Sequence, residues 1–290
     1  MRVAVTGAGG FIGSATVAAL RDAGHEAGAH LGPEQFDICD LDAVRAFVRG
    51  SDVVVHLAGP ASVSESFAQP AEFERVHAFG TATVLKAMED AGIARVVYVS
   101  SADVYGPAGV EAVREERALE PGSPYAKAKA KAERLLQAAH RLGRVSGFIV
   151  RPFSIYGHGM HPNSLVATIC AQAARSDDIY VNDLSPVRDY CFVADLAGLL
   201  VRAAERTTGE LVVVNAAYGK GYSVAEVIGA VADACGRRLA GRERGPKRPA
   251  GVEITRLVAD VTEAHRVLGW RASCDLTEGI KRSRLLPIAS

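Results

Sequence analysis

The chain has 290 residues, enough for one large domain or two modest ones, and 49% of them are hydrophobic. Its 33 basic side chains balance 33 acidic ones, so charge does not indicate nucleic acid or an anionic membrane as a partner. The apolar runs, such as Val53–Val55, are strand-sized, and none reaches the roughly twenty residues that span a bilayer.

In the first half of the chain, short β-branched runs alternate with amphipathic segments. In chain order we predict strands at residues 3–6, 26–32, 36–40, 53–58, 96–100 and 148–151, and helices at 11–23, 42–49, 73–91 and 124–142. This alternation predicts an α/β fold, a Rossmann-type doubly wound parallel sheet with helices on both faces. In such a sheet the ligand crevice lies beyond the carboxyl ends of the strands, so functional residues should follow strands.

The first predicted strand runs directly into a glycine-rich turn. Residues 7–13 read GAGGFIG, which places Gly7, Gly10 and Gly13 in a G-x-x-G-x-x-G spacing before a helix. Glycines allow a tight turn and let a diphosphate approach the backbone amides at the helix N-terminus. Gly13 would also let the helix pack close to the strand. Because the turn opens a βαβ series, it predicts a dinucleotide site rather than a glycine turn without a ligand.

The carboxyl end of the second strand leaves the choice of dinucleotide open. An acidic residue commonly stands there to bind the adenine ribose, but residues 26–32 read EAGAHLG. No acid follows the strand, and no arginine is ready for a 2′-phosphate. We expect NAD, with NADP as an open alternative.

A tyrosine and a lysine share one face of the helix predicted at 124–142. Ser123 can cap this helix, and Tyr125 then falls in its first turn. Lys129 is four residues further on and lies on the face of the tyrosine, whereas Lys127 and Lys131 point elsewhere. The alternative is a solvated helix, because alternating lysine and alanine usually marks an exposed surface.

Several motifs together point to one family. They occur in this order along nearly the whole chain: TGAGGFIGS (6–14), DICD (37–40), HLAG (56–59), SVSES (62–66), GTATVLKA (80–87), VVYVSSADVYG (96–106), SPYAKAKAKAE (123–133), RPFSIYG (151–157), VRDYCFVADLA (187–197), GYSVAEVI (221–228), RPAG (248–251) and LVADVTEAHRVLGW (257–270). The chain resembles the extended short-chain dehydrogenase/reductase superfamily, specifically the NAD-dependent epimerase/dehydratase family of nucleotide-sugar enzymes. That family contains 4-epimerases, 4,6-dehydratases, 4-keto reductases and decarboxylases, so the resemblance does not fix one reaction.

The resemblance implies a domain division and a set of site residues. A dinucleotide-binding Rossmann domain is expected at 1–152, joined by 188–216, and a smaller, mixed substrate-binding domain mainly at 153–290. The implied catalytic residues are Ser101, Tyr125 and Lys129. The implied cofactor-binding residues are Gly7, Gly10, Phe11, Ile12, Gly13, Asp37, Ile38, Leu57, Ala58, Gly59, Ser100, Tyr125, Lys129 and Phe153. The implied substrate-binding residues are Ser101, Asp103, Tyr125, Ser154, His161, Asn163, Arg188 and Arg248.

The chemistry of the family accounts for these residue types. Oxidation of a sugar alcohol needs a base, and a free tyrosine titrates at about 10. A cation beside the phenol favours the phenolate, and Lys129 would supply one while also holding the nicotinamide ribose. Ser101 would bind the same sugar oxygen as Tyr125. Hydride would then pass between the sugar carbon and the nicotinamide.

Four further charged residues have expected roles, and for three of them there is a competing interpretation. Arginine suits a diphosphate because its planar fork donates two hydrogen bonds, as implied for Arg188 and Arg248. For Arg248 the alternative is a solvated loop, since other cationic residues crowd nearby. We expect Glu133 to pair with Lys129, four residues earlier, rather than to act as an acid. We expect Asp195 to cap a helix at 196–205 rather than to touch substrate.

Three departures from the family pattern narrow the reaction. Ala102 stands where 4,6-dehydratases have an acid, so ordinary dehydration is not expected, and Asp103 is either an auxiliary base or a loop residue. His77 replaces the usual asparagine and is either packed or in contact near the nicotinamide. The short second-strand segment resembles the keto-reductase branch, in which the cofactor exchanges. His161 lies in MHPNS (160–164), similar to a segment of epimerase/reductases where the histidine is an acid/base; otherwise it is a loop histidine.

These features lead to three hypotheses. The first is an NAD(P)-dependent enzyme that acts by hydride transfer at a sugar carbon of a nucleoside diphosphate sugar, most readily an epimerase. The second is an NAD(P)H-dependent reductase of 4-keto sugar nucleotides. The third is a non-catalytic dinucleotide-binding protein of the same fold. The presence of all three implied catalytic residues argues against this third hypothesis. The shape of the pocket-lining loops determines which nucleotide and which sugar bind. The sequence does not identify either of them.

Assembly and location are also expected from the sequence. The resemblance implies a homodimer in which helices 73–91 and 124–142 of two copies form a four-helix bundle, with alanines at 126, 128, 130, 132, 138 and 139 allowing close approach. Five scattered cysteines form no paired framework and no metal spacing, so we expect reduced thiols, no metal and a cytoplasmic protein. Because the first predicted strand follows almost at once, we also expect no signal peptide.

Overall fold

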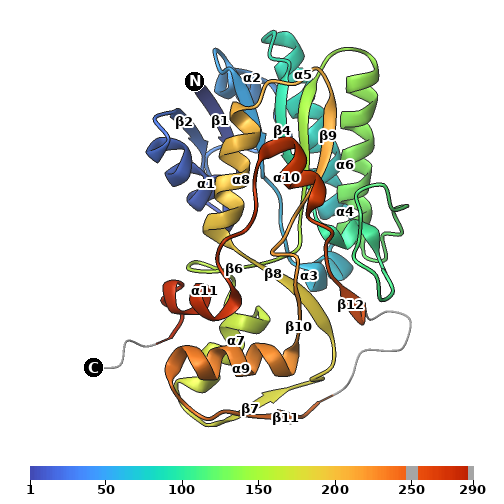
Figure 1. Ribbon diagram of the computed structural model, residues 1–290. Coiled ribbons are helices and arrows are strands. Elements are labelled where there is room, and N and C mark those ends of the chain that lie inside the picture. Colours follow the sequence, from blue (N-terminus) through green and yellow to red (C-terminus); the bar gives the residue numbers. More distant parts are fainter. Residues whose placement is uncertain (246–253, 287–290) are drawn as a thin grey trace.

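A six-stranded parallel sheet forms the core of the upper part of the molecule in Figure 1. The computed structural model describes residues 1–245 and 254–286. The strands lie in the order β2-β1-β3-β4-β5-β9, and every neighbouring pair is parallel. Their bounds are β1 (Arg2–Thr6), β2 (Glu26–His30), β3 (Val53–His56), β4 (Arg95–Val99), β5 (Ser146–Pro152) and β9 (Leu211–Ala216). The predicted α/β Rossmann fold is confirmed.

Helices cover both faces of this sheet, as its apolar strands require. The helices are α1 (Phe11–Asp22), α2 (Leu41–Val48), α3 (Val63–Ala68), α4 (Pro70–Glu74), α5 (Gly80–Asp90), α6 (Pro124–Arg141) and α8 (Val193–Glu205). Val3 and Val5 of β1 pack in one cluster with α1 and α8, whereas Ala4 packs in another with α2, α5 and α6. Successive strand residues therefore face opposite layers, and the sheet is buried from both sides.

A smaller part with mixed strand pairing lies below the large sheet in Figure 1. Strand β8 pairs antiparallel with β10 and parallel with β6 and β12, and β7 pairs with β11. The strands are β6 (Ser154–Tyr156), β7 (Asp178–Val181), β8 (Val187–Phe192), β10 (Gly221–Ser223), β11 (Ala240–Glu243) and β12 (Arg256–Leu257). Its helices are α7 (Leu165–Ala173), α9 (Val224–Cys235) and α11 (Leu276–Arg282), whereas α10 (Thr262–Leu268) lies against the upper part (Figure 1). The predicted smaller, mixed part is therefore confirmed, while the exact domain division at 152 and 188–216 stays a prediction.

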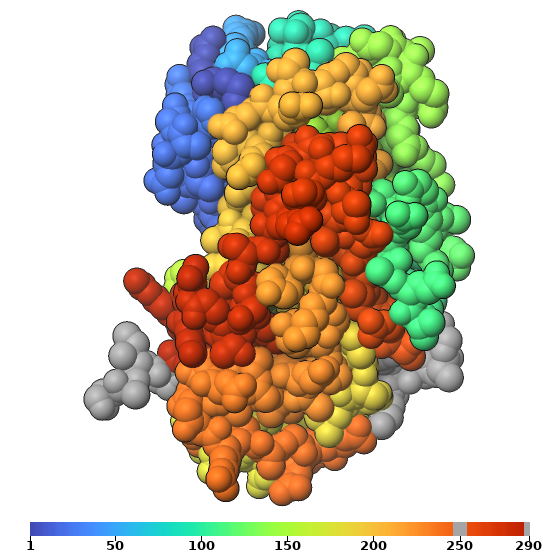
Figure 2. All heavy atoms as spheres, in the orientation of Figure 1, coloured from blue at the N-terminus to red at the C-terminus, as the bar shows by residue number. Residues whose placement is uncertain are grey.

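The C-terminal segment connects the two parts of the molecule. Figure 2 shows this segment, in red, lying over the upper body and then descending to the lower one. Ala264 and Leu268 of α10 and the following Trp270 pack in the cluster of α1 and α8. Leu276 and Ile280 of α11 pack instead with α7 and α9. No helix among residues 1–245 and 254–286 is both long and apolar enough to cross a bilayer.

The strand predicted at 36–40 is wrong, because this segment is a turn that leads into α2. The carboxylate of Asp37 accepts a hydrogen bond from the N–H of Cys39, 2.9 Å away. The carboxylate of Asp40 accepts from two first-turn amides of α2, those of Asp42 (3.0 Å) and Ala43 (3.2 Å). Local side-chain acceptors thus replace strand pairing with a turn and a helix cap.

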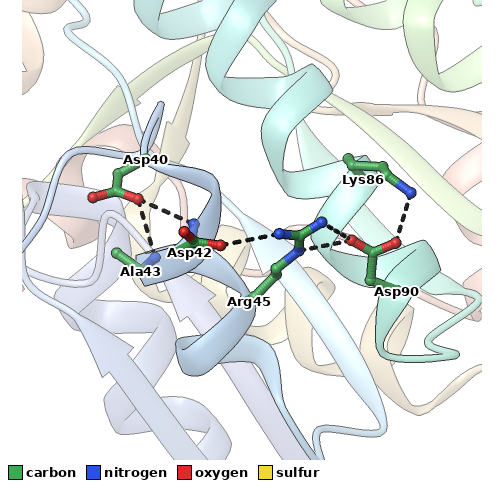
Figure 3. A network of polar contacts seen from close by, with 6 residues as sticks. All are labelled: Asp40, Asp42, Ala43, Arg45, Lys86 and Asp90. Carbon is green, nitrogen blue, oxygen red and sulfur yellow. Dashed lines mark hydrogen bonds and ion pairs between the residues drawn. The ribbon is translucent and has the colours of Figure 1, made fainter.

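An exposed ion-pair network holds α2 against α5 (Figure 3). The guanidinium of Arg45 lies 3.0 Å from the carboxylate of Asp42 on its own helix and 2.5 Å from that of Asp90 at the end of α5. Lys86, one turn before Asp90, donates to the same carboxylate at 2.6 Å. Such exposed pairs contribute modest stability, so the apolar contacts of the two helices carry most of the packing.

The helix predicted over 73–91 is interrupted. A π-helical turn at Arg75–Phe79 separates α4 from α5. This turn carries His77, whose side chain is buried, and Phe79, which is 58% exposed. The periodicity of the sequence does not reveal the extra residue of a π turn, because the surrounding segments remain helical.

The alanines of α6 mostly pack inside their own chain. Ala126, Ala128, Ala130 and Ala132 are each at most 3% exposed in the single chain. The close approach that they permit is therefore toward the sheet and helices of the same molecule. The alanine argument for a dimer is wrong for these four positions, whereas the dimer itself stays a prediction.

Candidate active site

The residues predicted to bind a dinucleotide and a sugar gather at one edge of the six-stranded sheet. The parallel strands β1, β3, β4 and β5 end there, followed by Gly7, Leu57–Gly59, Ser100–Ser101 and Phe153–Ser154 respectively. A Cβ placed on Gly7 would lie only 2.7 Å from the backbone nitrogen of Ala58, so the first two of these segments touch. After β1 the chain enters α1 on one face of the sheet, and after the neighbouring β3 it continues to α5 on the other face. Open α/β sheets bind ligands at such a place.

The glycine turn has the geometry expected for close packing. Gly7 has a φ of +71°, which favours glycine, and a Cβ on Gly13 would lie 2.1 Å from the carbonyl oxygen of Gly7. Gly10 is the N-cap of α1 and has no side chain to offer the first helical amides. These amides, which include those of Phe11 and Ile12, are therefore left for a ligand at the positive end of the helix.

Ser101 and Tyr125 face each other from two different elements. Ser101 follows β4, and its hydroxyl accepts a hydrogen bond from the N–H of Asp103 at 3.2 Å, which caps a 3₁₀ turn. Tyr125 is 8% exposed, and the Ser101 side chain is close enough to its phenol to lower the pKa of that phenol. Ser123 caps α6 through a 3.1 Å hydrogen bond from the N–H of Ala126, which places Tyr125 in the first turn as predicted.

Lys129 lies on the buried face of α6 with Tyr125. It is 4% exposed, and its Nζ donates to the carbonyl oxygen of Val99 at the end of β4, 2.8 Å away. Lys127 and Lys131 are exposed on the other side of the helix. The helical spacing therefore selects Lys129, as the sequence predicts.

The pKa values of Tyr125 and Lys129 differ from the expectation that a charged lysine lowers the pKa of the phenol. Burial raises the pKa of the Tyr125 phenol, the Asp103 carboxylate raises it further, and the hydrogen bond with Ser101 lowers it. Burial lowers the pKa of Lys129 to about 7, and the charge of Glu133 opposes this change. The protein groups alone do not favour the phenolate, because desolvation outweighs the field of one partly neutral amine.

Glu133 has a different partner from the one predicted. Its carboxylate pairs with Arg151 of β5, with Nε 3.0 Å from Oε1 and Nη2 2.6 Å from Oε2. It also accepts a 2.5 Å hydrogen bond from the Ser100 hydroxyl. The predicted ion pair with Lys129 is wrong, because the Lys129 ammonium is directed to the carbonyl of Val99.

Asp195 does not cap a helix. Helix α8 begins at Val193, so Asp195 lies inside its first turn. Its carboxylate accepts from the N–H groups of Ser273 (3.1 Å) and Cys274 (2.9 Å). Asp195 therefore ties the segment before α11 to helix α8, and the predicted capping role is wrong.

His77 is a packed histidine that supports the tyrosine. Its Nε2 lies 2.8 Å from the carbonyl oxygen of Pro60, and its ring centroid is 5.5 Å from that of Tyr125 in an edge-on contact. A Cβ on Gly59 would lie 2.2 Å from the His77 ring. Burial lowers the pKa of His77 well below its usual value, so the ring is neutral at pH 7.

The predicted adenine contacts lie at the outer end of the crevice. Asp37 is exposed and pairs with Arg75 at 2.7 Å, whereas Ile38 is 4% exposed and belongs to the core. The hydrogen bond from the N–H of Cys39 is the main cause that lowers the pKa of Asp37, followed in the same direction by Arg75. At the end of β2, the buried His30 holds the carbonyl oxygen of Phe36 through Nε2 at 3.0 Å.

The predicted substrate residues come from the smaller part and its connections. Ser154 lies in β6 opposite Tyr190 of β8, and Arg188 lies two residues earlier in β8, half-buried. His161 and Asn163 lie in an exposed loop, where the N–H of Asn163 donates to Nδ1 of His161 at 3.1 Å. Arg248 lies outside the residues that the structure describes.

Comparison with known proteins supplies the family. Residues 3–217 match the sequence profile of the NAD dependent epimerase/dehydratase family. The chain belongs to this family. The predicted membership and the prediction of an NAD-dependent enzyme are thereby confirmed.

Relatives of this epimerase/dehydratase-family enzyme cover more than nine-tenths of its length. UDP-glucose 4-epimerase of Streptomyces lividans is 32% identical over 308 residues, which span 93% of this chain and 91% of that protein. GDP-6-deoxy-D-mannose reductase of Pseudomonas aeruginosa is 29% identical over 295 residues, spanning 97% and 95%. The solved structure of MoeE5 in complex with UDP-glucuronic acid and NAD has a TM-score of 0.85 at 29% identity, covering 98% of this chain and 97% of that one.

The site of this NAD-dependent enzyme fits its cofactor on its own geometry. Side chains at Gly7 or Gly13 would collide with backbone atoms, so the turn can only be built from glycine. The bare turn leaves the amides of the α1 N-terminus accessible to a diphosphate, and Ala58 lies beside it. Phe153, 8% exposed, follows β5 at the same edge of the sheet.

Sequence reasoning missed the network around Arg151. Its guanidinium Nη1 lies 2.9 Å from the Tyr105 hydroxyl, which donates to Oδ1 of Asn215 at 2.7 Å. A signal was present, because strands covered on both faces are apolar and an arginine in one needs a buried partner. The partner, Glu133, could not be chosen from spacing along the chain alone.

Proposed function

We propose that this enzyme acts on the sugar of a nucleoside diphosphate sugar and interconverts epimers by hydride transfer at a sugar carbon. The observation that carries the proposal is the meeting of Ser101, Tyr125 and Lys129 beside the glycine turn at the carboxyl ends of the strands. Similarity to UDP-glucose 4-epimerases along nearly the whole chain supports the same activity.

Each residue of the group has a task in the proposed reaction. NAD supplies a hydride acceptor when bound. The Tyr125 oxygen removes the proton of the sugar hydroxyl and later returns it, while the Ser101 hydroxyl binds the same sugar oxygen. Lys129 holds positive charge near the phenol and binds the nicotinamide ribose. Because burial raises the pKa of Tyr125, the additional positive charge of the oxidised cofactor would be needed for the proton to leave at neutral pH.

On the substrate side, arginine and short polar side chains would hold the nucleotide. Arg188 projects from the sheet of the smaller part and suits a diphosphate oxygen, and Arg248 is proposed for the same task. Ser154 and Asp103 would contact the sugar. His161 and Asn163 stand in the loop before α7, where they would contact the substrate or only stabilise the loop.

The second candidate is an NAD(P)H-dependent reductase of 4-keto sugar nucleotides. The end of β2 favours it, because His30, Leu31 and Gly32 offer no carboxylate to the adenine ribose. A cofactor with one fewer anchor exchanges more readily, and a reductase needs such exchange at each turnover. The relative named GDP-6-deoxy-D-mannose reductase supports this alternative.

The two functions are distinguished by the fate of a labelled hydride. The purified enzyme is given NADH or NADPH deuterated at the transferred position, together with UDP-, dTDP- and GDP-sugars and their 4-keto forms. Interconversion of two 4-hydroxy sugars with little label and no net cofactor loss is expected. Stoichiometric deuterium in the product and consumption of reduced cofactor would contradict the epimerase and favour the reductase.

A control tests the third possibility, a protein that binds the dinucleotide without catalysis. Denaturation of the purified enzyme should release a dinucleotide, whose redox state and 2′-phosphate are read by mass spectrometry. Turnover of no sugar by a protein that binds NAD(P) would favour a sensor. The cytoplasmic location and the domain division remain proposals alongside these functions.

A further inference from the structure

A buried ion pair lies directly behind the catalytic group. Glu133 and Arg151 are 0% and 3% exposed, and the guanidinium reaches both carboxylate oxygens. Replacing a buried ion pair by apolar side chains of similar volume is often neutral or stabilising in proteins. Stability of the fold is therefore a weak explanation for this pair.

The pair joins the segments that carry the catalytic group. Glu133 follows Lys129 by four residues, so the two side chains leave the same face of α6. The Glu133 carboxylate accepts from the hydroxyl of Ser100, the residue directly before Ser101. Arg151 stands at the carboxyl end of β5, the next strand of the sheet. One carboxylate thus fixes α6 to the ends of two strands.

Arg151 is held in turn by groups on its other edge. Its Nη1 lies 2.9 Å from the Tyr105 hydroxyl and 3.0 Å from the carbonyl oxygen of Glu115. Oδ1 of Asn215 accepts from Tyr105 at 2.7 Å, and the N–H of Asn215 donates to the Glu115 carboxylate at 2.8 Å. The guanidinium therefore has little freedom to leave Glu133.

Glu133 is also the carboxylate whose charge acts on the Lys129 ammonium. Five further titratable side chains lie around the two residues. Tyr125 belongs to α6 itself, and the others come from four different elements: His56, His77, Tyr98 and Tyr105. Burial lowers the pKa of both histidines and raises that of all three phenols, so each of these groups is neutral near pH 7. Nζ of Lys129 lies 5.0 Å from the centroid of the Tyr98 ring.

The remaining charged groups nearby face other partners. Asp103 acts on the Tyr125 phenol, and Arg151 faces Glu133. Glu133 binds the hydroxyl of Ser100, directly after the Val99 carbonyl that accepts from Lys129, so its negative charge is placed to balance the buried ammonium.

We propose that Glu133, held by Arg151, is a positioning residue that keeps Lys129 charged and aligned with Ser101. The inference rests on the proposed function only in that Lys129 takes part in turnover. It adds a residue on β5 and a residue on α6 to the group that determines the activity.

The test uses Glu133→Gln, which keeps an oxygen acceptor for Ser100 and Arg151 and removes the negative charge. The titration of Lys129 is followed in the protein without added ligand by NMR of ¹³Cε-labelled lysines, with its signal assigned through Lys129→Met. We expect the midpoint in the variant to fall by about one pH unit, the scale of one nearby charge in a partly buried site. The alkaline limb of the kcat/KM profile should move in the same direction.

Glu74→Gln is the matched control, since Glu74 pairs with Lys131 on the exposed side of the same helix. It should leave the Lys129 midpoint and the pH profile unchanged. An unchanged midpoint in Glu133→Gln, with only a lower melting temperature, would overturn the proposal and leave the pair a purely structural one.

A second variant guards against misfolding of the first. Glu133→Gln with Arg151→Met removes both charges, so no unpaired guanidinium remains buried. The Lys129 midpoint should again fall, by less than in Glu133→Gln, because loss of the Arg151 charge opposes loss of the Glu133 charge. A double variant that titrates like the natural protein would equally overturn the proposal. Absence of any sugar-nucleotide turnover would contradict the proposed function, whereas the lysine titration tests the ion pair by itself.

Discussion

Burial separates the three lysines of α6 in their energetics as well as in their geometry. Lys129 is 4% exposed, whereas Lys127 and Lys131 are exposed. Transfer of an ammonium group from water to this position disfavours its charged form, which lowers the pKa of Lys129 to about 7. The side chain that serves the proposed chemistry therefore reduces the stability of the folded chain at neutral pH.

Lys129→Met should stabilise the fold in a pH-dependent way. The pKa of Lys129 falls from its ordinary value of 10.5 to about 7 on folding. Between these values the unfolded chain binds more protons, so the free energy of unfolding of the natural protein rises with pH, by at most about 1.4 kcal/mol per pH unit. The free energy of unfolding of Lys129→Met should exceed that of the natural protein by the largest amount at about pH 7 and below. This difference should vanish toward about pH 10.

Denaturant unfolding at several pH values measures this effect. Lys127→Met, an exposed lysine two residues away, should follow the natural protein throughout. Parallel curves for Lys129→Met and the natural protein would contradict the pKa shift. Binding of NAD(H), measured by calorimetry, should be weakened in Lys129→Met alone.

Tyr125→Phe should remove turnover and spare the fold. Loss of the hydroxyl removes its polar interaction with Ser101, while the ring contacts with Phe73 and His77 remain. General acid–base catalysis typically contributes about 10² to 10⁴-fold, so kcat should fall by that factor. Circular dichroism and NAD(H) affinity should change little. Retention of more than about a tenth of the activity would indicate a different proton acceptor.

Single residues were predictable where their partners lie close in sequence. Tyr125 and Lys129 share a helix face, and Ser123 caps the same helix, so spacing alone brings them together. The partner of Glu133 could not be predicted in this way, because Arg151 comes from a strand 18 residues away. The spacing of four residues along the helix predicted Lys129 as the ion-pair partner of Glu133. In the folded chain, packing of α6 against β5 brings Arg151 to that carboxylate instead.

Among the elements, the turn between β1 and α1 offers the cleanest test of cofactor binding. A Cβ on Gly10 would meet only the carbonyl oxygen of Gly7, at 3.3 Å, and Gly10 has an ordinary φ of −77°. Gly10→Asp should therefore fold, yet its carboxylate would stand against the diphosphate. We expect NAD(H) affinity to fall by about tenfold or more, or about 1.4 kcal/mol.

Gly10→Asn is the control of equal size without the charge, and it should lose less affinity than Gly10→Asp. Calorimetry with NAD, NADH, NADP and NADPH measures all four affinities. Equal binding by Gly10→Asp and the natural protein would mean that the diphosphate lies elsewhere. Gly13→Ala should instead lower the melting temperature, because its Cβ would lie 2.1 Å from Gly7.

Helices and strands were predicted correctly where a pattern of apolar residues extends over the whole element. The prediction was wrong where polar side chains bind nearby backbone amides and thereby determine the local structure. The inner strands β1, β3, β4 and β5 stand out because most of their residues are apolar on both faces. The segment 36–40 alternates apolar and polar residues like a strand, yet Asp37 and Asp40 bind backbone amides and turn the chain. Alternation alone could not show that these carboxylates would be used locally.

Over the whole molecule, exposed apolar side chains near α6 support the proposed homodimer. Phe67 of α3 and Phe79 of the π-helical turn are 59% and 58% exposed, and both segments pack beside α6. Large exposed aromatic side chains often mark an interface. Light scattering of the natural protein at micromolar concentration should give twice the mass of one chain.

Phe79→Asp should weaken this dimer, because a carboxylate would be buried without a partner. Val110→Asp is the control, since Val110 is 83% exposed in the loop between β4 and α6. It should leave the mass unchanged. A monomeric natural protein, or dissociation by Val110→Asp but not by Phe79→Asp, would contradict the proposed bundle.

Because of the π-helical turn, the number of residues between α4 and α5 matters for the site as much as their identity does. A π turn holds one residue more than an α-helical turn, so Arg75–Phe79 acts as a one-residue insertion in a helix from Pro70 to Asp90. Deletion of one residue here would restore a regular helix and rotate α4 against α5 by about 100°. The position of His77 beside Tyr125 would then be lost even if every remaining side chain were kept. Insertions and deletions in this stretch should therefore be tolerated far less than substitutions on its exposed side.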